Sequence, residues 1–532
     1  MAFYIVAAGG SLYSVNTSGV ATTLTLPTGV TLDVTKPARM AVLGRLVCIV
    51  NQPSRSLTVD GKNVVRPMVL QPPSGAPVLG TGSGGVYSGT VRAIYTNIIK
   101  DAESGALIAE SDFSAASASA TVSANSVQAD GILVSQDPGI TARRLYRTVT
   151  GPGTAFLPWV DLDGNTLTKI ADDMSDAALG LLAAPTELGS APGMITGSRM
   201  TNIVEWKGRL WGVGDTDVDI LRYSGNGISY GWPTSGAIPI NPVGADSFGI
   251  TGLMRRRDEL GVSKRNIIWK ITGDRVLNFT PIKVIEGKGV WGTDTVIIIR
   301  DIAYFLGEDG VYTWGPTGVD CISDEKVRGW FATDTYFNRA KFADAFATYN
   351  PRYHAYELHL AAAGSSTIDR WVSYDIARRE WFGPHLTNAF TPTWSTVFID
   401  VNNFNAPLMG ASNGFLYQQN QTAFNDDGNA IPISWVSKSH NADAPDDTKI
   451  FQDLSLLMKR QGTAGSLAIG IALGDYDASI AKTFTADLRK TRQRFNNCGP
   501  GRNVRLEFTE STLNQGAELH GYEIPWGVLG RR

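Results

Sequence analysis

Short runs of alternating apolar and polar residues recur along the whole chain, and glycine-containing turns separate them. In four places a glycine precedes an apolar or aromatic pair: Gly10-Ser11-Leu12-Tyr13, Gly208-Arg209-Leu210-Trp211, Gly310-Val311-Tyr312 and Gly414-Phe415-Leu416-Tyr417. Glycine supplies the positive φ of a hairpin turn, and the large residues after it fill a core between sheets. Short strands with periodic glycine and aromatic residues are typical of a β-propeller. An array of β-sandwiches is the alternative.

Two breaks in this pattern predict domain boundaries. The Pro- and Gly-rich run from Pro72 to Gly85 predicts a flexible linker. It leads into a block of about seven short strands, ending near Pro185, that resembles a fibronectin type III module. A polar loop between Gln418 and Asn429 forms the second break, and the alternation then resumes to the end of the chain.

We therefore expect an all-β protein of three parts. Residues 1–77 and 186–424 would form a discontinuous β-propeller, 78–185 a fibronectin type III-like insertion, and 425–532 a C-terminal β-sandwich. The propeller part has room for about six or seven blades, and an N-terminal strand would pair with late blades to close the ring. One short helix is predicted at Ser323–Trp330.

Charge and cysteine content narrow the class of protein. With 47 Lys and Arg against 50 Asp and Glu, the net charge of −3 excludes a broadly basic nucleic-acid binder. Cys48, Cys321 and Cys498 are far apart and lie in strand-like contexts, so we expect buried thiols rather than a disulfide framework. The start at Met1 lacks the features of a signal peptide, and no apolar run is long enough to predict a membrane span.

The residues that could carry chemistry do not form a recognisable constellation. The histidines are His354, His359, His385, His440 and His520, and the first two would lie on opposite faces of one strand. Two acidic runs could offer oxygens to calcium but lack the EF-hand glutamate: Asp161, Asp163 and Asn165, and Asp215, Asp217 and Asp219. We interpret both as turns or solvated edges.

One turn comes close to a sialidase motif but departs from its spacing. In Glu308-Asp309-Gly310-Val311-Tyr312-Thr313-Trp314 the aspartate and glycine are adjacent, unlike in the sialidase Asp-box, so a hairpin turn is expected. Neither a nucleophile elbow nor a phosphate-binding glycine loop is present in its required context. The sequence therefore predicts no catalytic, cofactor-binding or metal-binding residue, no cofactor, and a protein that is not an enzyme.

Two basic clusters have more than one interpretation. They are Arg255-Arg256-Arg257 with Lys264-Arg265, and Arg489-Lys490 with Arg492 and Arg494. Solvated loops or edge strands protected by charge would explain both. An acidic partner surface or a transient contact with phosphate is the alternative.

One region resembles a known family of viral proteins. The segment Tyr349-Asn350-Pro351-Arg352-Tyr353-His354-Ala355-Tyr356 leads to Asp369-Arg370-Trp371-Val372-Ser373-Tyr374-Asp375 and Arg378-Arg379-Glu380-Trp381. This order is similar to that of tail nozzle proteins of short-tailed bacteriophages and of the related packaged-DNA stabilisation proteins. The turn at Glu308–Tyr312 and the end of the chain, from Lys449-Ile450-Phe451 to Gly521-Tyr522-Glu523-Ile524, also resemble that group.

The resemblance implies a structural protein of the virion. It implies a ring, usually of six copies, below the head-to-tail adaptor, which extends the DNA channel, retains the packaged genome and allows its ejection. Implied partners are further copies of the chain, the adaptor, tail fibres or spikes, and double-stranded DNA that passes without sequence-specific binding. Assembly would take place in the host cytoplasm. A glycan-binding or glycan-cleaving β-propeller protein of a phage fibre or cell surface is the alternative.

Overall fold

The computed structural model describes residues 3–51, 55–151, 153–179, 188, 200–214, 217–240, 248–275, 278–387, 389–400, 402, 405–419, 423, 425–462, 464–475, 478–514 and 516–531. It has two compact units, each treated by itself below. The first comprises Met1–Ile368, Val372–Gly383 and Ser395–Pro407, and the second Asp369–Trp371, Pro384–Trp394 and Leu408–Arg532. With 51% of residues in strands and 4% in helices, the predicted all-β class is confirmed.

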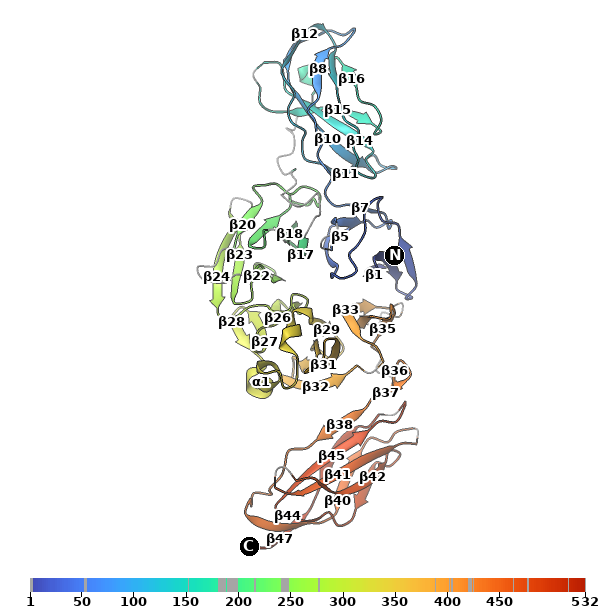
Figure 1. Ribbon diagram of the computed structural model, residues 1–532, viewed down its shortest axis with the longest axis vertical. Coiled ribbons are helices and arrows are strands. Elements are labelled where there is room, and N and C mark those ends of the chain that lie inside the picture. Colours follow the sequence, from blue (N-terminus) through green and yellow to red (C-terminus); the bar gives the residue numbers. More distant parts are fainter. Residues whose placement is uncertain are drawn as a thin grey trace. The chain divides into compact units, whose positions relative to one another are not determined.

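Seven antiparallel sheets of three or four strands follow one another along much of the described chain (Figure 1). In order they are β1 (Phe3–Ala8), β2 (Ser11–Asn16) and β3 (Ala21–Leu24); β4 (Arg39–Leu43), β5 (Leu46–Val50), β6 (Leu57–Val59) and β7 (Val65–Pro67); β17 (Met200–Trp206), β18 (Arg209–Gly214), β19 (Ile220–Tyr223) and β20 (Ala237–Pro239); β21 (Gly252–Arg255), β22 (Leu260–Ser263), β23 (Ile267–Thr272) and β24 (Thr280–Glu286); β25 (Ile297–Ile299), β26 (Ile302–Leu306), β27 (Val311–Gly315) and β28 (Gly318–Cys321); β29 (Phe346–Asn350), β30 (Ala355–Ala361), β31 (Ile368–Asp375) and β32 (Glu380–Leu386); and β33 (Pro392–Ile399), β34 (Asn405–Ala411) and β35 (Leu416–Gln418).

Helices are short and few in the described residues. The α-helix α1 (Asp324–Ala332) lies where the sequence predicts one, and 3₁₀ turns occupy Asp176–Ala178 and Arg339–Asp344.

The glycines of the repeated pattern are explained by two different constraints. Lys207 and Gly208 have φ values of 51° and 72° and form the two-residue turn that joins Trp206 to Arg209. Two positive φ values define the hairpin turn whose twist matches the flanking strands. At Gly310, by contrast, a Cβ would lie 2.5 Å from the Ser323 Oγ, so the close approach of that hydroxyl excludes a side chain.

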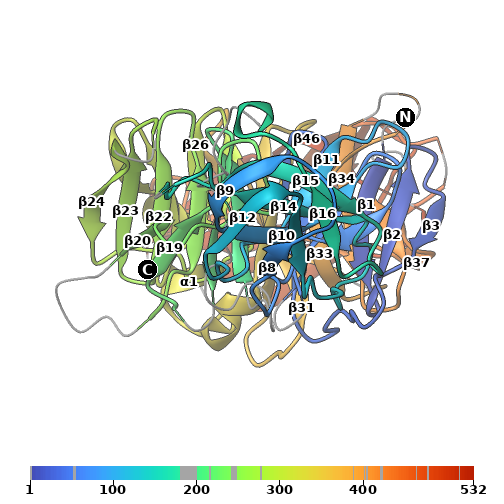
Figure 2. The same ribbon diagram turned by 90° about the horizontal axis from the view of Figure 1, so that it is seen from above.

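The first strands of successive sheets lie next to one another in the first unit. β17 packs beside β4 and β21, β21 beside β25, and β25 beside β29. Within each sheet the later strands follow in chain order, as Figure 2 shows for β22, β23 and β24. Aromatic side chains fill the space between β17–β20 and β21–β24, with Trp206, Trp211 and Tyr223 buried there.

The predicted pairing of the N-terminal strand with late strands is wrong for the described residues. β1 pairs with β2 in a sheet of its own, because the two-residue turn at Gly9 and Gly10 returns the chain at once. The late contact is made by a side chain instead. The Tyr4 ring packs on Phe398 with centroids 4.8 Å apart, and the Ile399 N–H donates to the Tyr4 hydroxyl at 2.9 Å.

The insertion consists of three small sheets around one core of buried residues, which includes Tyr95, Leu145 and Trp159. Their strands are β11 (Leu107–Glu110), β10 (Ala93–Lys100), β14 (Ala142–Arg147) and β15 (Leu157–Asp163); β16 (Ile170–Asp172), β13 (Val127–Asp130) and β8 (Val78–Thr81); and β12 (Ala120–Asn125) with β9 (Tyr87–Val91).

The insertion contains an Ala- and Ser-rich stretch from Ser111 to Ser126, and three of its serines bind the backbone of β10. The Oγ atoms of Ser111, Ser114 and Ser117 accept from three backbone N–H groups of β10 at 2.9–3.0 Å. The backbone N–H groups of the same serines donate to β10 carbonyls at 2.9 Å. Spaced three residues apart, these serines satisfy the edge of β10 without forming a regular strand.

The expected flexible linker at Pro72–Gly85 is wrong at its glycine-rich end. Val78–Thr81 forms β8, and the Gly82 N–H donates to the Ser126 carbonyl at 2.9 Å. A Cβ on Gly85, whose φ is 106°, would lie 2.8 Å from the Ser126 nitrogen. These glycines allow close packing beside β12 and β13 rather than free movement.

In the second unit the C-terminal residues form one four-stranded and two three-stranded sheets around a common core. The four-stranded sheet has the order β38 (Ile433–Val436), β45 (Asn503–Glu510), β41 (Ser466–Gly474) and β42 (Ile480–Asp487). One three-stranded sheet has the order β43 (Arg492–Phe495), β40 (Leu454–Met458) and β46 (Leu519–Glu523), and the other has the order β44 (Gly499–Gly501), β39 (Asp447–Phe451) and β47 (Trp526–Arg531). The four-stranded sheet and the sheet β43–β40–β46 are here called the C-terminal sheet pair. A small hairpin, β36 (Asn425–Asp426) and β37 (Asn429–Ala430), precedes them.

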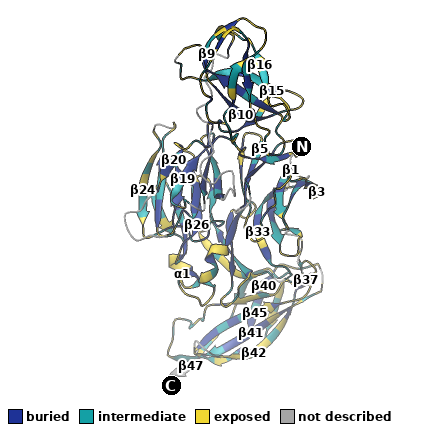
Figure 3. Ribbon diagram, turned by 45° about the horizontal axis from the view of Figure 1, so that its top comes forward, coloured by how far each residue is buried: buried dark blue, intermediate teal, exposed yellow. Residues whose placement is uncertain are grey.

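The core of the C-terminal sheet pair is apolar and closed at one end by a buried lysine. Buried residues line β41 and β45, as the colouring of Figure 3 shows, and include Ile469, Ile471 and Leu506. Lys449 is fully buried, and its Nζ donates to the carbonyls of Ala444, Asp447 and Arg502. These three acceptors compensate for the loss of water around the ammonium group.

The predicted domain boundaries stay predictions. Position 424 and the boundary at 185–186 lie outside the described residues. The structure does show that the insertion and the C-terminal residues each have a buried core of their own, around Trp159 and around Ile471.

Candidate functional site

The turn at Glu308-Asp309-Gly310 is a hairpin connection, as the sequence predicts. It joins β26 to β27, with Leu306 opposite Val311. The Asp309 carboxylate accepts from the Tyr312 hydroxyl and lies 3.3 Å from the Lys288 Nζ. Burial opposes ionisation of Asp309, but the hydrogen bond from Tyr312 and the charge of Lys288 outweigh it and lower the pKa of the carboxyl. The group is an ionised partner in a structural network.

The first acidic run forms ion pairs at the edge of the insertion. Asp161 accepts from the Arg144 Nε at 2.8 Å and lies 2.9 Å from the Lys100 Nζ, which also reaches Asp163 at 3.1 Å. Burial tends to raise the pKa of Asp161, but the bonds from Arg144 and Lys100 lower it overall. Asn165 bonds to the backbone of Ser135. These oxygens are occupied by cationic side chains and backbone groups.

The second acidic run is also paired where it is described. Asp215 lies outside the described residues, Asp217 pairs with Arg222 at 2.7 Å, and Asp219 lies 2.7 Å from the Nζ of Lys264. Within the ranges that the structure describes, no three His, Cys, Asp or Glu side chains gather as a metal site requires. The cysteines Cys48, Cys321 and Cys498 are free thiols, and the first and last are buried as expected.

Four of the five histidines pack against aromatic rings, and His520 lies 3.5 Å from a Glu518 oxygen instead. His354 is in the turn after β29, where its Nδ1 lies 2.7 Å from the Tyr349 hydroxyl, whereas His359 is buried in β30. The His359 ring stacks on Phe346 with centroids 4.6 Å apart, and burial lowers its pKa to about 3. His385 stacks on Trp371 at 4.1 Å, and burial lowers its pKa as well. His440 lies 3.1 Å from the Tyr522 hydroxyl.

The first basic cluster is solvated only in part, because Arg255 and Arg257 are exposed as the sequence suggested but other members are not. Arg256 and Lys264 are buried, because each has an internal counter-charge: Glu259 at 3.0 Å and Asp219 at 2.7 Å. The Arg256 guanidinium also lies over the Trp314 ring at 4.7 Å. Arg265 covers Trp291 at 4.9 Å. The cluster therefore stabilises neighbouring sheets of the first unit.

The second basic cluster is exposed. Arg489 pairs with Asp487 at 3.1 Å and Arg494 with Asp453 at 2.7 Å, while Lys490 and Arg492 are solvent-exposed and have no ion pair within the described residues. Arg492 and Arg494 belong to β43, at one edge of its sheet. The prediction of an edge strand with exposed charge is confirmed.

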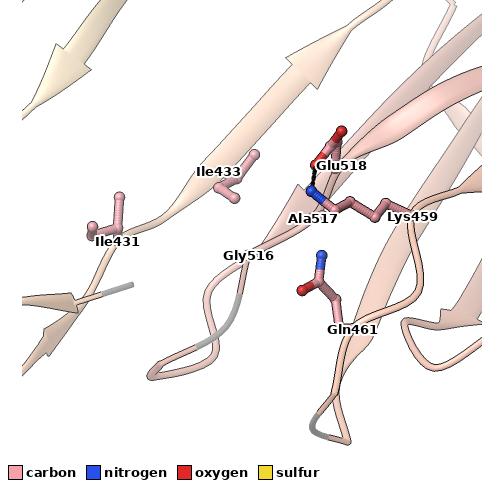
Figure 4. Close-up of a pocket in the computed structure, with 7 residues that line it drawn as sticks. All are labelled: Ile431, Ile433, Lys459, Gln461, Gly516, Ala517 and Glu518. Carbon is pink, nitrogen blue, oxygen red and sulfur yellow. Dashed lines mark hydrogen bonds and ion pairs between the residues drawn. The ribbon is translucent and has the colours of Figure 1, made fainter. Parts of the chain in front are cut away.

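The C-terminal sheet pair also has a hollow, which sequence reasoning missed. It has a volume of about 340 Å³ and lies between the start of β38 and the loops beside β40 and β46. Ile431 and Ile433 face Lys459, Gln461 and Glu518 across it, as Figure 4 shows. The Lys459 Nζ lies 2.9 Å from a Glu518 oxygen. Its lining would suit a side chain with an apolar stem and a polar end.

An aromatic surface in the second unit was not recognised as a site either. The rings of Phe390 and Tyr417 are parallel with centroids 3.9 Å apart, and Phe415, which is 66% exposed, lies beside Tyr417. The Tyr417 hydroxyl accepts from Asn413 and donates to Asp427. The Gly414-Phe415-Leu416-Tyr417 pattern pointed to these residues but was interpreted as core.

Comparison with known proteins gives only distant likenesses. No family model matches the chain, and no curated protein matches it. Among solved structures, the extracellular domain of a one-component system from B. thetaiotaomicron is similar over 98% of this chain and 80% of its own, with 9% identity and a TM-score of 0.27.

Two further solved structures have comparable values. PorZ, a surface component of the type-IX secretion system of Porphyromonas gingivalis, is 9% identical over 99% of this chain and 80% of its own, with a TM-score of 0.26. An exo-β-1,3-galactanase from Phanerochaete chrysosporium is 10% identical over 81% of this chain and 95% of its own, with a TM-score of 0.21. These neighbours are surface proteins and a glycan hydrolase, and TM-scores this low support no conclusion about the present chain. In the part of the chain that is described, no helix has the length and apolar character of a membrane span.

Proposed function

We propose that the seven sheets from β1 to β35 form a closed β-propeller, with a fibronectin type III-like insertion at 78–185 and a C-terminal β-sandwich at 425–532. The side-by-side first strands β4, β17, β21, β25 and β29 support this arrangement. So does the contact of Tyr4 with Phe398, since it joins the first sheet to a strand of the seventh within one unit. Such closure removes exposed sheet edges.

We further propose that the protein is a structural component of the virion, the tail nozzle of a short-tailed bacteriophage. The observation that carries this proposal is the role of the segment that resembles the nozzle family. Its residues form the turns and core of the sheet β29–β32, as expected for a motif that specifies a scaffold.

Each half of the segment stabilises a turn. The Asn350 side chain donates to the buried Glu357 at 2.7 Å and accepts from the Arg352 N–H at 3.1 Å, which shapes the connection from β29 to β30. In the next turn the Asp375 carboxylate accepts from the N–H groups of Ala377 and Arg378, both at 2.9 Å. Side chains that cap a turn in this way fix its backbone.

The aromatic residues of the segment connect it to neighbouring elements. The buried Tyr356 hydroxyl donates to the Thr295 carbonyl at 2.9 Å, and its ring stacks on Tyr304. The Trp381 indole N–H donates to the Ile322 carbonyl at 3.0 Å. Both bonds satisfy a polar atom of an otherwise apolar ring within the core.

The proposed role is structural rather than enzymatic. The carboxylates that motif analysis singled out, such as Asp309 and Asp161, are engaged by lysine, arginine or tyrosine. With near balance between acidic and basic residues, the walls of a channel built from this chain would hold DNA weakly. Channel walls that bind DNA weakly favour rapid passage of the DNA. Retention of the genome would then depend on a steric constriction.

The proposed partners are further copies of this chain in a cyclic ring, a hexamer as the resemblance implies, with the head-to-tail adaptor above and tail fibres or spikes attached. The test is to incubate the purified chain with the adaptor ring of the same phage and to image the product by electron microscopy. A ring coaxial with the adaptor is expected, and particles that lack the protein should lose DNA. A chain that stays monomeric with the adaptor, or DNA-filled heads that are stable without it, would refute the nozzle assignment.

A second candidate function, glycan binding, is favoured by one observation. Phe415 is exposed beside the stacked pair Phe390 and Tyr417, and the polar groups Asn413 and Asp427 lie at the same place. Aromatic faces with adjacent polar groups suit the apolar faces and hydroxyls of sugars. A glycan array should show binding that Phe415→Ala abolishes if this function is correct, and no binding if the nozzle role is the whole function.

A further inference from the structure

The C-terminal sheet pair has two lateral sides, each made by one edge strand from each sheet. β42 and β43 form the first, here called the basic side, and β38 and β46 form the second, here called the acidic side. Side-chain contacts join the strands within each side. The ring of Phe484 on β42 stacks on that of Phe495 on β43, with centroids 5.2 Å apart. The ring centroids of Trp435 on β38 and Tyr522 on β46 are 6.2 Å apart.

The basic side presents cations on an unpaired strand. Arg489, Lys490, Arg492 and Arg494 are all exposed, and Asp487 and Asp453 neutralise only the first and last of them. Arg492 therefore keeps its charge free for another group. Lys482, on β42, lies over the Phe484 ring at 5.3 Å and adds to the positive field.

The acidic side combines carboxylates with exposed apolar surface. Glu523 on β46 is exposed and has no ion pair within the described chain, whereas Glu518, which flanks the hollow of about 340 Å³, is already paired with Lys459 at 2.9 Å. The hollow is bordered by Ile431 and Ile433. Trp435 is 44% exposed.

Such a surface is costly to leave in water. β38, β42, β43 and β46 are edge strands with one unpaired side, and an exposed edge with apolar side chains promotes association with another chain. Because Lys490 and Arg492, which have no ion pair among the described residues, lie on one side and Glu523, likewise without an ion pair there, lies on the other, each side is complementary to the other side of a second copy rather than to itself.

We propose that the basic side of one copy docks on the acidic side of the next, with Arg492 beside Glu523 and the exposed Trp435 covered by the contact. The contact joins two different surfaces, so repeating it produces a closed ring or an open filament. Ring closure rests on the proposed nozzle function, while the contact itself is argued from the charges and exposed edges above.

Cysteine cross-linking tests the contact in the full-length chain. In a Cys321→Ser background, which leaves Cys48 and Cys498 buried, the exposed neighbours are replaced by Thr491→Cys and Pro525→Cys, singly and together, so that Arg492 and Glu523 stay in place, and the protein is treated with a short bis-maleimide in the presence of the adaptor ring. The double variant should produce a ladder of covalent oligomers that ends at one closed species. A mixture of the two single variants should stop at dimers, and each single variant alone should remain monomeric.

Other cross-linking outcomes separate this inference from the proposed function. Dimers from either single variant alone would indicate a symmetric contact and overturn the head-to-tail arrangement. Rings visible by electron microscopy without any ladder would refute this contact but leave the nozzle function intact. Absence of both rings and ladder would refute the two together.

Charge exchange provides an independent measurement. Arg492→Glu or Glu523→Arg should each weaken self-association on the order of tenfold or more, and the double exchange should restore most of it. The matched control is Arg275→Glu, since Arg275 is 83% exposed in a turn of the first unit and should leave association unchanged. Equal weakening by the control, or a double variant no better than the single ones, would contradict the proposed pairing.

Discussion

Arg39 on β4 holds Asp294, 255 positions further along the chain, through two hydrogen bonds of 2.7 and 2.8 Å from Nε and Nη2 to the two carboxylate oxygens. A third donor of the same guanidinium, Nη1, bonds to the Thr201 carbonyl on β17. The Asp294 carbonyl in turn accepts from the Ala347 N–H on β29 at 3.0 Å. One arginine therefore connects three sheets that are distant in sequence.

Removing this carboxylate should destabilise the first unit. Asp294→Ala leaves a largely buried guanidinium with two unmet hydrogen bonds, so we expect a loss of about 2 kcal/mol in the free energy of unfolding. Urea denaturation followed by tryptophan fluorescence measures it, and an Arg39/Asp294 double-mutant cycle isolates the pair. Arg378→Ala is the control, because Arg378 is 74% exposed and its ion pair with Asp375 is 3.4 Å long. Equal loss in the two variants would contradict a special role for Arg39.

The local parts of this fold could be predicted from the sequence, and the Arg39–Asp294 pair could not. Alternation predicts strands, and positive-φ glycines such as Gly208 predict their turns, because both depend on a few neighbouring residues. A pair separated by 255 positions has no local signature. The same limit applies to Arg256 and Lys264, because their partners Asp301 and Asp219 are distant in sequence and are assigned only by the folded chain.

The surface features were predictable only in part. Exposed charge on β43 follows from the spacing of Arg492 and Arg494, which alternate on one strand. The hollow beside Glu518 could not be predicted, because Ile431, before β38, and Lys459, after β40, are brought together only by the fold. Glycines are common in linkers, but Gly82 and Gly85 are needed because Ser126 approaches their backbone closely. Only the folded structure shows this contact.

The insertion should be anchored by one buried carboxylate. Asp137 accepts from the Arg55 guanidinium at 2.5 and 2.8 Å and from the Gln71 N–H, while the Asn97 side chain donates to the Gln71 carbonyl at 2.9 Å. Asp137→Ala removes this anchor and leaves Arg55 largely buried without its partner, at a cost of about 3 kcal/mol.

Limited proteolysis checks the anchor. In the Asp137→Ala variant, cleavage within the proline-rich residues 72–77 should become much faster than in the parent protein. Lys62→Ala is the matched control, because its pair with Glu103 joins the same two parts but has side chains 56% and 79% exposed. Unchanged cleavage in the Asp137 variant would show that apolar contacts around Leu70 and Ile99 suffice.

Two glycines should respond in opposite directions to alanine. A Cβ on Gly289 would lie 2.0 Å from the backbone oxygen of Lys264, which cannot move without disturbing its sheet, so Gly289→Ala should be strongly destabilising. Gly329 is within α1 and has nothing near its Cβ position, so Gly329→Ala should stabilise by about 0.5–1 kcal/mol through helix propensity. Thermal unfolding of both variants measures the difference, and a harmless Gly289→Ala would mean that the chain around Lys264 can shift.

His359 should make the first unit sensitive to mild acid. Its ring is buried in β30, and burial lowers its pKa from 6.5 to about 3 in the folded state. Above pH 6.5 the imidazole is neutral whether the chain is folded or not, so it contributes no pH dependence. Between pH 6.5 and 3 the unfolded chain binds a proton that the folded chain does not. Stability should therefore fall by about 1.4 kcal/mol for each pH unit in this window.

Replacing His359 by phenylalanine should flatten this dependence. In the parent protein the His359 and Phe346 rings stack with centroids 4.6 Å apart and an interplanar angle of 12°. A phenylalanine ring keeps this stacking but cannot bind a proton. Urea titrations at pH 7.5, 6.5, 6.0 and 5.5 stay above the range, beginning at about pH 5, in which ion-paired carboxylates such as Asp309 lose their contribution to stability, so the histidine contribution is isolated there. His520→Gln is the control, because His520 is half exposed in the second unit. If His359→Phe and the parent lose stability with the same slope, the buried imidazole is not the acid-sensitive group, and the remaining slope belongs to His385, whose pKa burial also lowers.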